Sequence, residues 1–111
     1  MRPFAGLTPG FRVPFMLTSK QKQYLRGLAH HLKPVIMVGD KGLTDAVCEE
    51  TRRALDHHEL IKVKIAGSDR VQRQSDAAEL CDRTGAERVQ IMGRIATLYL
   101  RNPEKARIKL P

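Results

Sequence analysis

Hydrophobic positions along the chain recur at two intervals, and the two intervals alternate. Segments with apolar residues three or four positions apart, the spacing of an amphipathic helix, are separated by short apolar or alternating runs typical of strands. This pattern predicts helices over residues 19–31, 45–57 and 71–84, and strands over residues 35–38, 59–66, 87–92 and 96–100. The resulting order of helix, strand, helix, strand, helix, strand, strand indicates an α/β fold. Crossover helices imply parallel pairing and the final hairpin adds an antiparallel pair, so we expect a mixed sheet.

Local signals mark where the predicted elements begin and end. Thr18, with Gln21 three residues later, forms a capping box ahead of the first helix. Thr44 is a candidate N-cap for the second helix, and Gly85 is placed to end the third. Gly93 predicts a tight hairpin between the last two strands.

The same pattern predicts which side chains are buried. The strand over residues 35–38 is continuously apolar, so we expect it to be buried on both faces. The strand over residues 59–66 alternates, which places Lys62 and Lys64 on the face opposite its apolar side chains. The helix positions expected to point inward are Leu25, Leu28, Ala29 and Leu32 in the first helix, Val47, Thr51, Ala54, Leu55 and His58 in the second, and Ala77, Ala78, Leu80 and Cys81 in the third.

The junction between the first strand and the second helix carries the most informative motif, Gly39-Asp40-Lys41-Gly42. Glycines can adopt backbone conformations closed to other residues, and they have no side chain to keep a ligand away. The free amides at the start of the following helix attract anions. Two glycines that enclose a cation at this point predict a clamp for a nucleic-acid backbone, and a simple strand-to-helix turn is the structural alternative.

The composition favours one globular domain behind a flexible extension. The chain has 111 residues, of which 41% are hydrophobic, and this suits a single domain with its own core. Residues 1–15 contain prolines and glycines without periodicity and are expected to form the extension, so the domain should span residues 16–111. There is no Trp and aromatic residues make up only 5%, so aromatic stacking on bases cannot be the main mode of recognition.

The chain carries no sequence signal for a membrane or for export. No apolar run approaches the ~20 residues that cross a bilayer, and the first residues lack a secretory signal, so we expect a cytoplasmic protein. Cys48 and Cys81 fall within predicted helices and are interpreted as buried reduced thiols, with a disulfide left as the alternative.

Charge is distributed unevenly along the chain. The formal net charge is +8. Residues 1–39 hold six Lys or Arg and no acid, and residues 88–111 hold six basic residues and one acid. Residues 40–87, in contrast, hold eight basic and eleven acidic residues. If the fold brings both ends of the chain beside the glycine loop, the result is one positive face that attracts polyanions. A solvated surface that keeps the protein soluble is the plainer explanation.

Four stretches of the chain together resemble a known family. They are residues 17–30 (LTSKQKQYLRGLAH), 32–35 (LKPV), 38–44 (VGDKGLT) and 57–64 (HHELIKVK). In combination they closely resemble the CRM domain, named for chloroplast RNA splicing and ribosome maturation, and most of all its small stand-alone bacterial members. The resemblance extends from residue 16 to about residue 111 and leaves residues 1–15 outside the family pattern.

The resemblance implies a fold and a function. It implies an α/β domain with a four-stranded mixed sheet, similar to the C-terminal domain of bacterial translation initiation factor three. It also implies RNA binding without catalysis: bacterial members are associated with precursors of the large ribosomal subunit, and plant relatives with group II intron splicing. Gly39, Asp40, Lys41 and Gly42 match the family's glycine loop position by position. The family varies at the two middle positions, so the role given to Lys41 rests on local chemistry.

The predicted mechanism is a clamp on the RNA backbone. The two loop glycines let a phosphate approach the main chain, helix amides donate to its oxygens, and Lys41 adds a point charge. The cations expected to extend this site are Lys22 and Arg26 on the first helix, Lys33, Lys62, Lys64 and Arg94. We expect them to converge around the loop, with solvated surface as the alternative for each. Phosphate contacts carry no sequence information, so specificity would come from RNA shape or from a protein already on the ribosome precursor.

Other chemistries find less support in the sequence. Adjacent histidines on a helix point in different directions, so the pairs His30-His31 and His57-His58 predict no metal site, and no cofactor is expected. No nucleophile motif or Walker-type loop is present. A phosphate- or nucleotide-binding enzyme that uses the same loop is one alternative, and a module that docks on an acidic protein is another. Nothing in the sequence requires more than a monomer.

Overall fold

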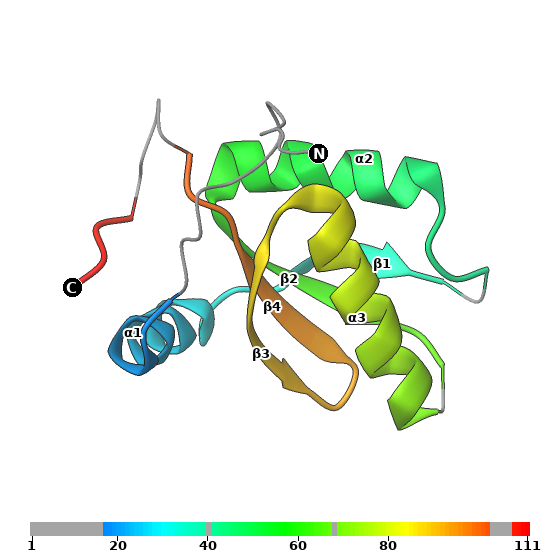
Figure 1. The fold of residues 1–111 in the computed structure, drawn as a ribbon, viewed down its shortest axis with the longest axis horizontal. Helices are drawn as coiled ribbons and strands as arrows, with labels where there is room; N and C mark the ends of the chain where they lie inside the picture. Colours follow the sequence, from blue (N-terminus) through cyan, green and yellow to red (C-terminus); the bar gives the residue numbers. More distant parts are fainter. Residues whose placement is uncertain (1–16, 40, 68, 103–107) are drawn as a thin grey trace, which may run out of the picture.

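The computed structural model describes residues 17–39, 41–67, 69–102 and 108–111 (Figure 1). Within them the elements follow the predicted order, and their bounds are α1 (Ser19–Ala29), β1 (Pro34–Val38), α2 (Asp45–His58), β2 (Leu60–Ile65), α3 (Arg70–Thr84), β3 (Glu87–Met92) and β4 (Ile95–Tyr99). The predicted α/β class, element order and four-stranded mixed sheet are therefore confirmed. The predicted extension, residues 1–15, lies outside the described residues.

The sheet brings four chain segments to one end. Its strand order is β1-β2-β4-β3, with β1 parallel to β2 and the other neighbours antiparallel. The amide of Ala66 donates to the carbonyl of Val38 (2.8 Å), and the amide of Ile65 donates to the carbonyl of Arg94 (2.7 Å). The ends of β1 and β2 and the β3–β4 hairpin therefore meet at the same end of the sheet, where the glycine loop also begins.

The two faces of the sheet are covered unequally. Helices α2 and α3 lie over one face and enclose the larger core with it (Figure 1). Helix α1 packs against β2 and β3 on the other face, where Leu25 and Ala29 meet Leu60, Val89 and Tyr99. Because α1 is a single short helix, it covers only the end of this face at which β2 begins. The rest of the face, toward the glycine loop, has no helix over it among the described residues.

The expectation that the strand over residues 35–38 is buried on both faces is wrong. Ile36 and Val38 are buried, but Val35 and Met37 are 50% and 58% exposed. The reason is that β1 is an edge strand, and its second face lies beyond the reach of α1. A short apolar run cannot by itself reveal that one side lacks a covering element.

Several helix positions expected to point inward are also exposed. Leu25, Ala29 and Leu55 are buried as expected, but Leu28 and Leu32 are 40% and 38% exposed. Helix α1 ends at Ala29, two residues before its predicted end, so Leu32 lies in the connection to β1. His58 and Ala78 are likewise exposed, because each lies outside the buried stripe of its helix.

The predicted caps are confirmed. Thr18 and Gln21 form the reciprocal capping box at the start of α1. The hydroxyl of Thr44 accepts a hydrogen bond from the amide of Val47 at the start of α2 (3.2 Å). Gly85 ends α3 in the left-handed conformation, with φ of +81°. These local signals fix the bounds of the helices, and through them the position of the glycine loop.

Glu59 holds the C-terminal segment in a way that the sequence does not suggest. Its side chain is fully buried, and its backbone φ is +61°, which is unfavourable for a residue with a side chain. One carboxylate oxygen accepts from the amide of Asn102 (2.7 Å) and the other from the amide of Ile108 (2.9 Å). Ile108 and Leu110 can then pack against the cluster under α1.

Two further findings concern the cysteines and the membrane. Cys48 is buried, Cys81 is partly buried, and neither forms a disulfide, as interpreted from the sequence. Among the described residues, no helix has the length and apolar character needed to cross a bilayer.

Candidate nucleic-acid interface

The glycine loop is a tight turn in which the two glycines have different roles. The amide of Gly42 donates to the carbonyl of Gly39 (3.0 Å), which closes the turn, and Gly42 has a φ of +76° that disfavours any side chain. Gly39 does not have a positive φ, and a Cβ built on it would meet no atom within 4 Å. Only Gly42 therefore uses the conformational freedom expected of both. Asp40 lies outside the described residues.

The bare surface at Gly39 is consequently not required by the protein's own packing. An alanine would fit there sterically and would reduce the entropy of the unfolded chain. The absence of a side chain leaves open space on the exposed side of the turn. That is the arrangement expected where a ligand approaches the backbone closely.

Three of the predicted cations lie at this end of the sheet. Lys41 is in the loop itself, and Lys64 is paired with Met37 on one side and Ile95 on the other. Arg94 precedes Ile95 in the hairpin, and its carbonyl is bonded to β2. All three side chains are exposed. The sheet topology therefore brings together cations that are far apart in sequence.

The remaining predicted cations extend away from the loop. Lys62 lies on the same face as Lys64, nearer α1, and is paired with Thr97. Lys33 immediately precedes β1. Lys22 and Arg26 are on α1, which lies at the left of Figure 1, whereas the glycine loop is at the right. We expected these cations to gather around the loop. Instead, they are spread from the loop to α1.

The flank of α1 that carries Lys22 and Arg26 can be assigned from its neighbours. The side chain of Gln21 donates to the carbonyl of Pro111 (3.2 Å), so the C-terminal segment lies along one flank of the helix. Leu28 lies on that same flank, close to Ile108. Helical geometry places Lys22 and Arg26 on the opposite flank, toward the uncovered part of the sheet.

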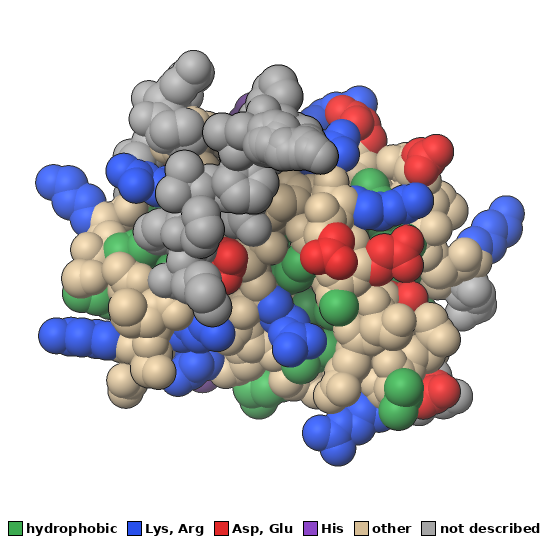
Figure 2. All heavy atoms as spheres, in the orientation of Figure 1, with side chains coloured by type: hydrophobic (Ala, Val, Ile, Leu, Met, Phe, Trp, Pro, Cys, Tyr) green, Lys and Arg blue, Asp and Glu red, His purple; other side chains and the backbone are tan. Residues whose placement is uncertain are grey.

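Acidic residues are concentrated on the other side of the molecule. The described acids of α2 and α3 are Asp45, Glu49, Glu50, Asp56, Asp76, Glu79 and Asp82. Figure 2 shows acidic side chains grouped over the layer that these two helices form. By contrast, α1, β1 and β4 contain no Asp or Glu. Because seven of the eleven acids of the central segment lie on the two crossover helices, the uncovered sheet face and the helix beside it have an excess of positive charge.

The structure adds two arginines that sequence reasoning missed. The guanidinium of Arg73 donates to the carbonyls of Gly67 (2.8 Å) and Gly93 (3.2 Å), which ties the β3–β4 hairpin to the turn before α3. Arg70 and Arg73 line a cleft of about 300 Å³ beside Gly93. In the sequence, these two arginines are marked only by being three residues apart in the first turns of a helix. Ordinary surface arginines show the same spacing, so it does not indicate a site.

No metal centre is evident in the described residues. No group of three or more His, Cys, Asp or Glu side chains is arranged to hold a metal ion in the part of the chain that the structure describes. The paired histidines do lie near each other, with ring centroids 5.3 Å apart for His30 and His31 and 6.3 Å apart for His57 and His58.

Comparison with known proteins finds relatives of this chain by sequence and by structure. An RNA-binding protein of Haemophilus influenzae is 53% identical over 95 residues, covering 86% of this chain and 95% of that protein. A probable RNA-binding protein of Bacillus subtilis is 36% identical over 96 residues, covering 86% of this chain and all of the relative. The solution structure of a hypothetical Staphylococcus aureus protein, described as a candidate RNA-binding protein, has a TM-score of 0.76 at 34% identity and covers 86% of this chain and 100% of its own. Residues 17–100 match the CRS1 / YhbY (CRM) domain, and the chain belongs to that family.

Proposed function

We propose that this protein binds RNA through its sugar-phosphate backbone and catalyses no reaction. The observation that carries the proposal is the separation of charge between the two faces, together with a bare, exposed Gly39 at the positive end. The names of the relatives support it, since they are called RNA-binding proteins. A polyanion approaching the uncovered face meets cations and avoids the acids of α2 and α3.

In this mechanism the glycine loop is the anchoring point. A phosphate approaches the main chain at Gly39, with Lys41, Lys64 and Arg94 close enough to neutralise it and its neighbours. The strand then continues past Lys62 toward α1. Asp45, in the first turn of α2, partly offsets the positive end of that helix, so the lysines supply most of the attraction.

The biological target follows from the family resemblance. We propose ribosomal RNA in precursors of the large subunit, bound in the cytoplasm by a monomer. The proposed phosphate contacts would position an RNA without reading its sequence. Target choice then depends on RNA shape or on a ribosomal protein already present.

A salt titration of RNA binding tests the proposal. We expect the logarithm of the association constant to fall linearly with the logarithm of the salt concentration, with a slope of about −0.7 for each phosphate contact. Lys64→Ala should weaken binding to unrelated RNAs equally and reduce the magnitude of that slope by about 0.7. Arg53→Ala, which removes the same charge from an exposed position on α2, is the matched control and should change binding little.

The alternatives would give different results. A module for an acidic protein would bind RNA weakly and without a common effect of Lys64→Ala across RNAs. A nucleotide-using enzyme would turn over nucleotide in purified form. Salt-insensitive RNA binding, or equal losses in Lys64→Ala and Arg53→Ala, would contradict the proposed face.

A further inference from the structure

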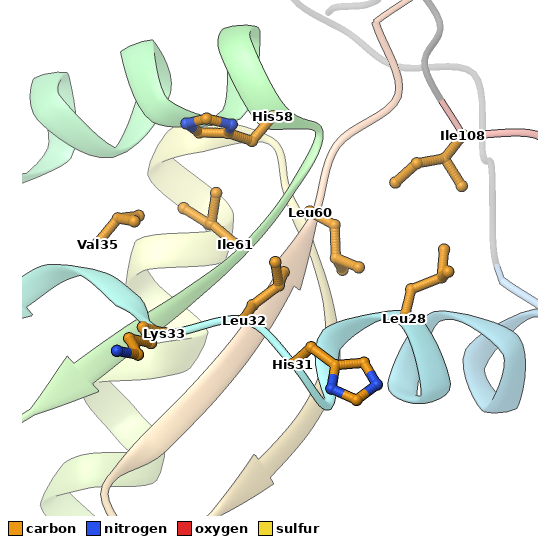
Figure 3. A pocket seen from close by; sticks show the side chains of 9 residues that line it. All are labelled: Leu28, His31, Leu32, Lys33, Val35, His58, Leu60, Ile61 and Ile108. Atoms are coloured by element: carbon orange, nitrogen blue, oxygen red, sulfur yellow. The ribbon is translucent and has the colours of Figure 1, made fainter.

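A hollow of about 400 Å³ lies at the end of the sheet opposite the glycine loop (Figure 3). It forms where the connection from α1 to β1 passes the start of β2 and the end of α2. Leu60 and Ile61, both buried, form its floor. Leu28 and Leu32 point into it from the α1 side, as Figure 3 shows. The hollow is therefore built from three separate stretches of the chain, namely residues 28–35, residues 58–61 and Ile108.

The walls of this hollow are unusually apolar for a surface. Leu28, Leu32 and Val35 are 40%, 38% and 50% exposed, and all three line the same cavity. An apolar occupant would remove these three side chains from water, which is energetically favourable. Isolated exposed aliphatic residues are common, but several that converge on one concavity are characteristic of a binding site.

The polar groups at the hollow select the charge of its occupant. His31, Lys33 and His58 are its polar lining residues, and no Asp or Glu among the described residues lines it. In Figure 3 the amine of Lys33 points out of the cavity, and His58 lies along its upper side. An occupant with an apolar body and an attached negative charge therefore fits better than a cation or a purely apolar ligand.

The hollow is continuous with the proposed RNA path. A shallow groove shares Lys33 and Val35 with it and runs along β1 past Met37 to Lys64. Lys64 is one of the cations at the loop end of the sheet. A single extended polyanion could thus lie along β1, with its negative charges near Lys33 and Lys64 and an apolar group in the hollow.

We propose that this hollow binds an unpaired nucleobase of the RNA, an inference that rests on the proposed function. A base presents two apolar faces to the aliphatic walls, while its polar edge reaches the histidines at the rim and its phosphate stays near Lys33. Flipped-out bases are bound between apolar or aromatic side chains in other proteins. Aliphatic walls would allow a protein with few aromatic residues to prefer unpaired RNA.

The test uses two RNAs of equal length, one single-stranded with 2-aminopurine at one position and one fully duplex. With the wild-type protein we expect the 2-aminopurine fluorescence to rise as the base leaves its stack. Leu32→Ser, a change outside the helices and strands, should abolish that rise and weaken single-strand binding about fivefold. It should leave duplex binding and the salt slope unchanged. Val71→Ser, at an exposed position on α3 that does not line the hollow, is the matched control and should change none of these quantities.

The possible failures can be told apart. If the wild-type protein binds neither RNA in a salt-dependent way, the proposed function itself fails. If it binds both, but Leu32→Ser alters neither, the hollow takes some other occupant, such as an apolar side chain of an acidic protein, and only this inference fails. If Leu32→Ser weakens both RNAs equally, the hollow does not distinguish an unpaired base, and the inference is again overturned.

Discussion

Replacing Gly39 with alanine should make the protein more stable and make it a weaker RNA binder. The added methyl group meets no atom within 4 Å, and the backbone there has no positive φ to disfavour it. Restricting the unfolded chain should therefore raise the free energy of unfolding by about 0.4–1 kcal/mol. In the proposed complex the same methyl group occupies the space through which a phosphate reaches the loop. Losing one charge-assisted hydrogen bond there costs at least ~1.4 kcal/mol, or about tenfold in affinity.

Urea denaturation measures the first quantity, and filter binding at fixed salt measures the second. Gly27→Ala in α1 is the matched control, because its methyl group also meets nothing within 4 Å. Gly27 lies on the side of α1 away from Leu25 and Ala29, so this change should stabilise the helix by about 0.5–1 kcal/mol and leave RNA binding unchanged. If Gly39→Ala binds RNA as tightly as the wild type, the turn at Gly39 is not where the protein holds the RNA backbone. If Gly39→Ala lowers the free energy of unfolding, the added methyl group does not have open space at this turn.

Three further predictions concern the fold that positions the site. Gly42→Ala should destabilise the protein by roughly 1–2 kcal/mol in the same urea assay, opposite in sign to Gly39→Ala, because of its φ of +76°. Glu59→Ala should cost about 3 kcal/mol through loss of the bonds from Asn102 and Ile108. Glu59→Gly should lose about 1 kcal/mol less than Glu59→Ala, because glycine tolerates the φ of +61°. An equal loss of stability in both variants would show that this φ imposes no strain. Burial raises the pKa of Tyr99 above 10.0, so its contribution to stability is complete below that pH and is lost above it. Tyr99→Phe should therefore lose less stability than the wild type as the pH rises above about 10, as followed by thermal melts.

The elements of this fold could be predicted because their signals are local. The capping box of Thr18 and Gln21, the cap at Thr44 and the glycine at position 85 each act within a few residues. Alternation along β2 placed Lys62 on the face opposite the larger core, as found. Such features depend on backbone geometry that neighbouring residues determine almost alone.

The arrangement of the site could not be predicted in the same way. Whether Val35 is buried depends on how far α1 extends over the sheet, which no periodicity reports. The separation of Lys22 from the glycine loop depends on the path of the chain from α1 into β1. The tail bonds of Glu59 reach 43 and 49 residues along the sequence. Each of these facts depends on which elements come to lie side by side.

The exposed edge strand connects stability with the proposed function. Among the described residues β1 is an edge strand with Val35 and Met37 half exposed, and such a strand can pair with other chains and risks aggregation. Flanking lysines are a common protection against such pairing, and Lys33 and Lys64 border the same apolar strip here. Those two lysines are also the cations that lead from the hollow to the glycine loop. The same two charges would therefore oppose pairing of β1 with another strand and hold an RNA along it, and replacing both with neutral residues should impair solubility and RNA binding together.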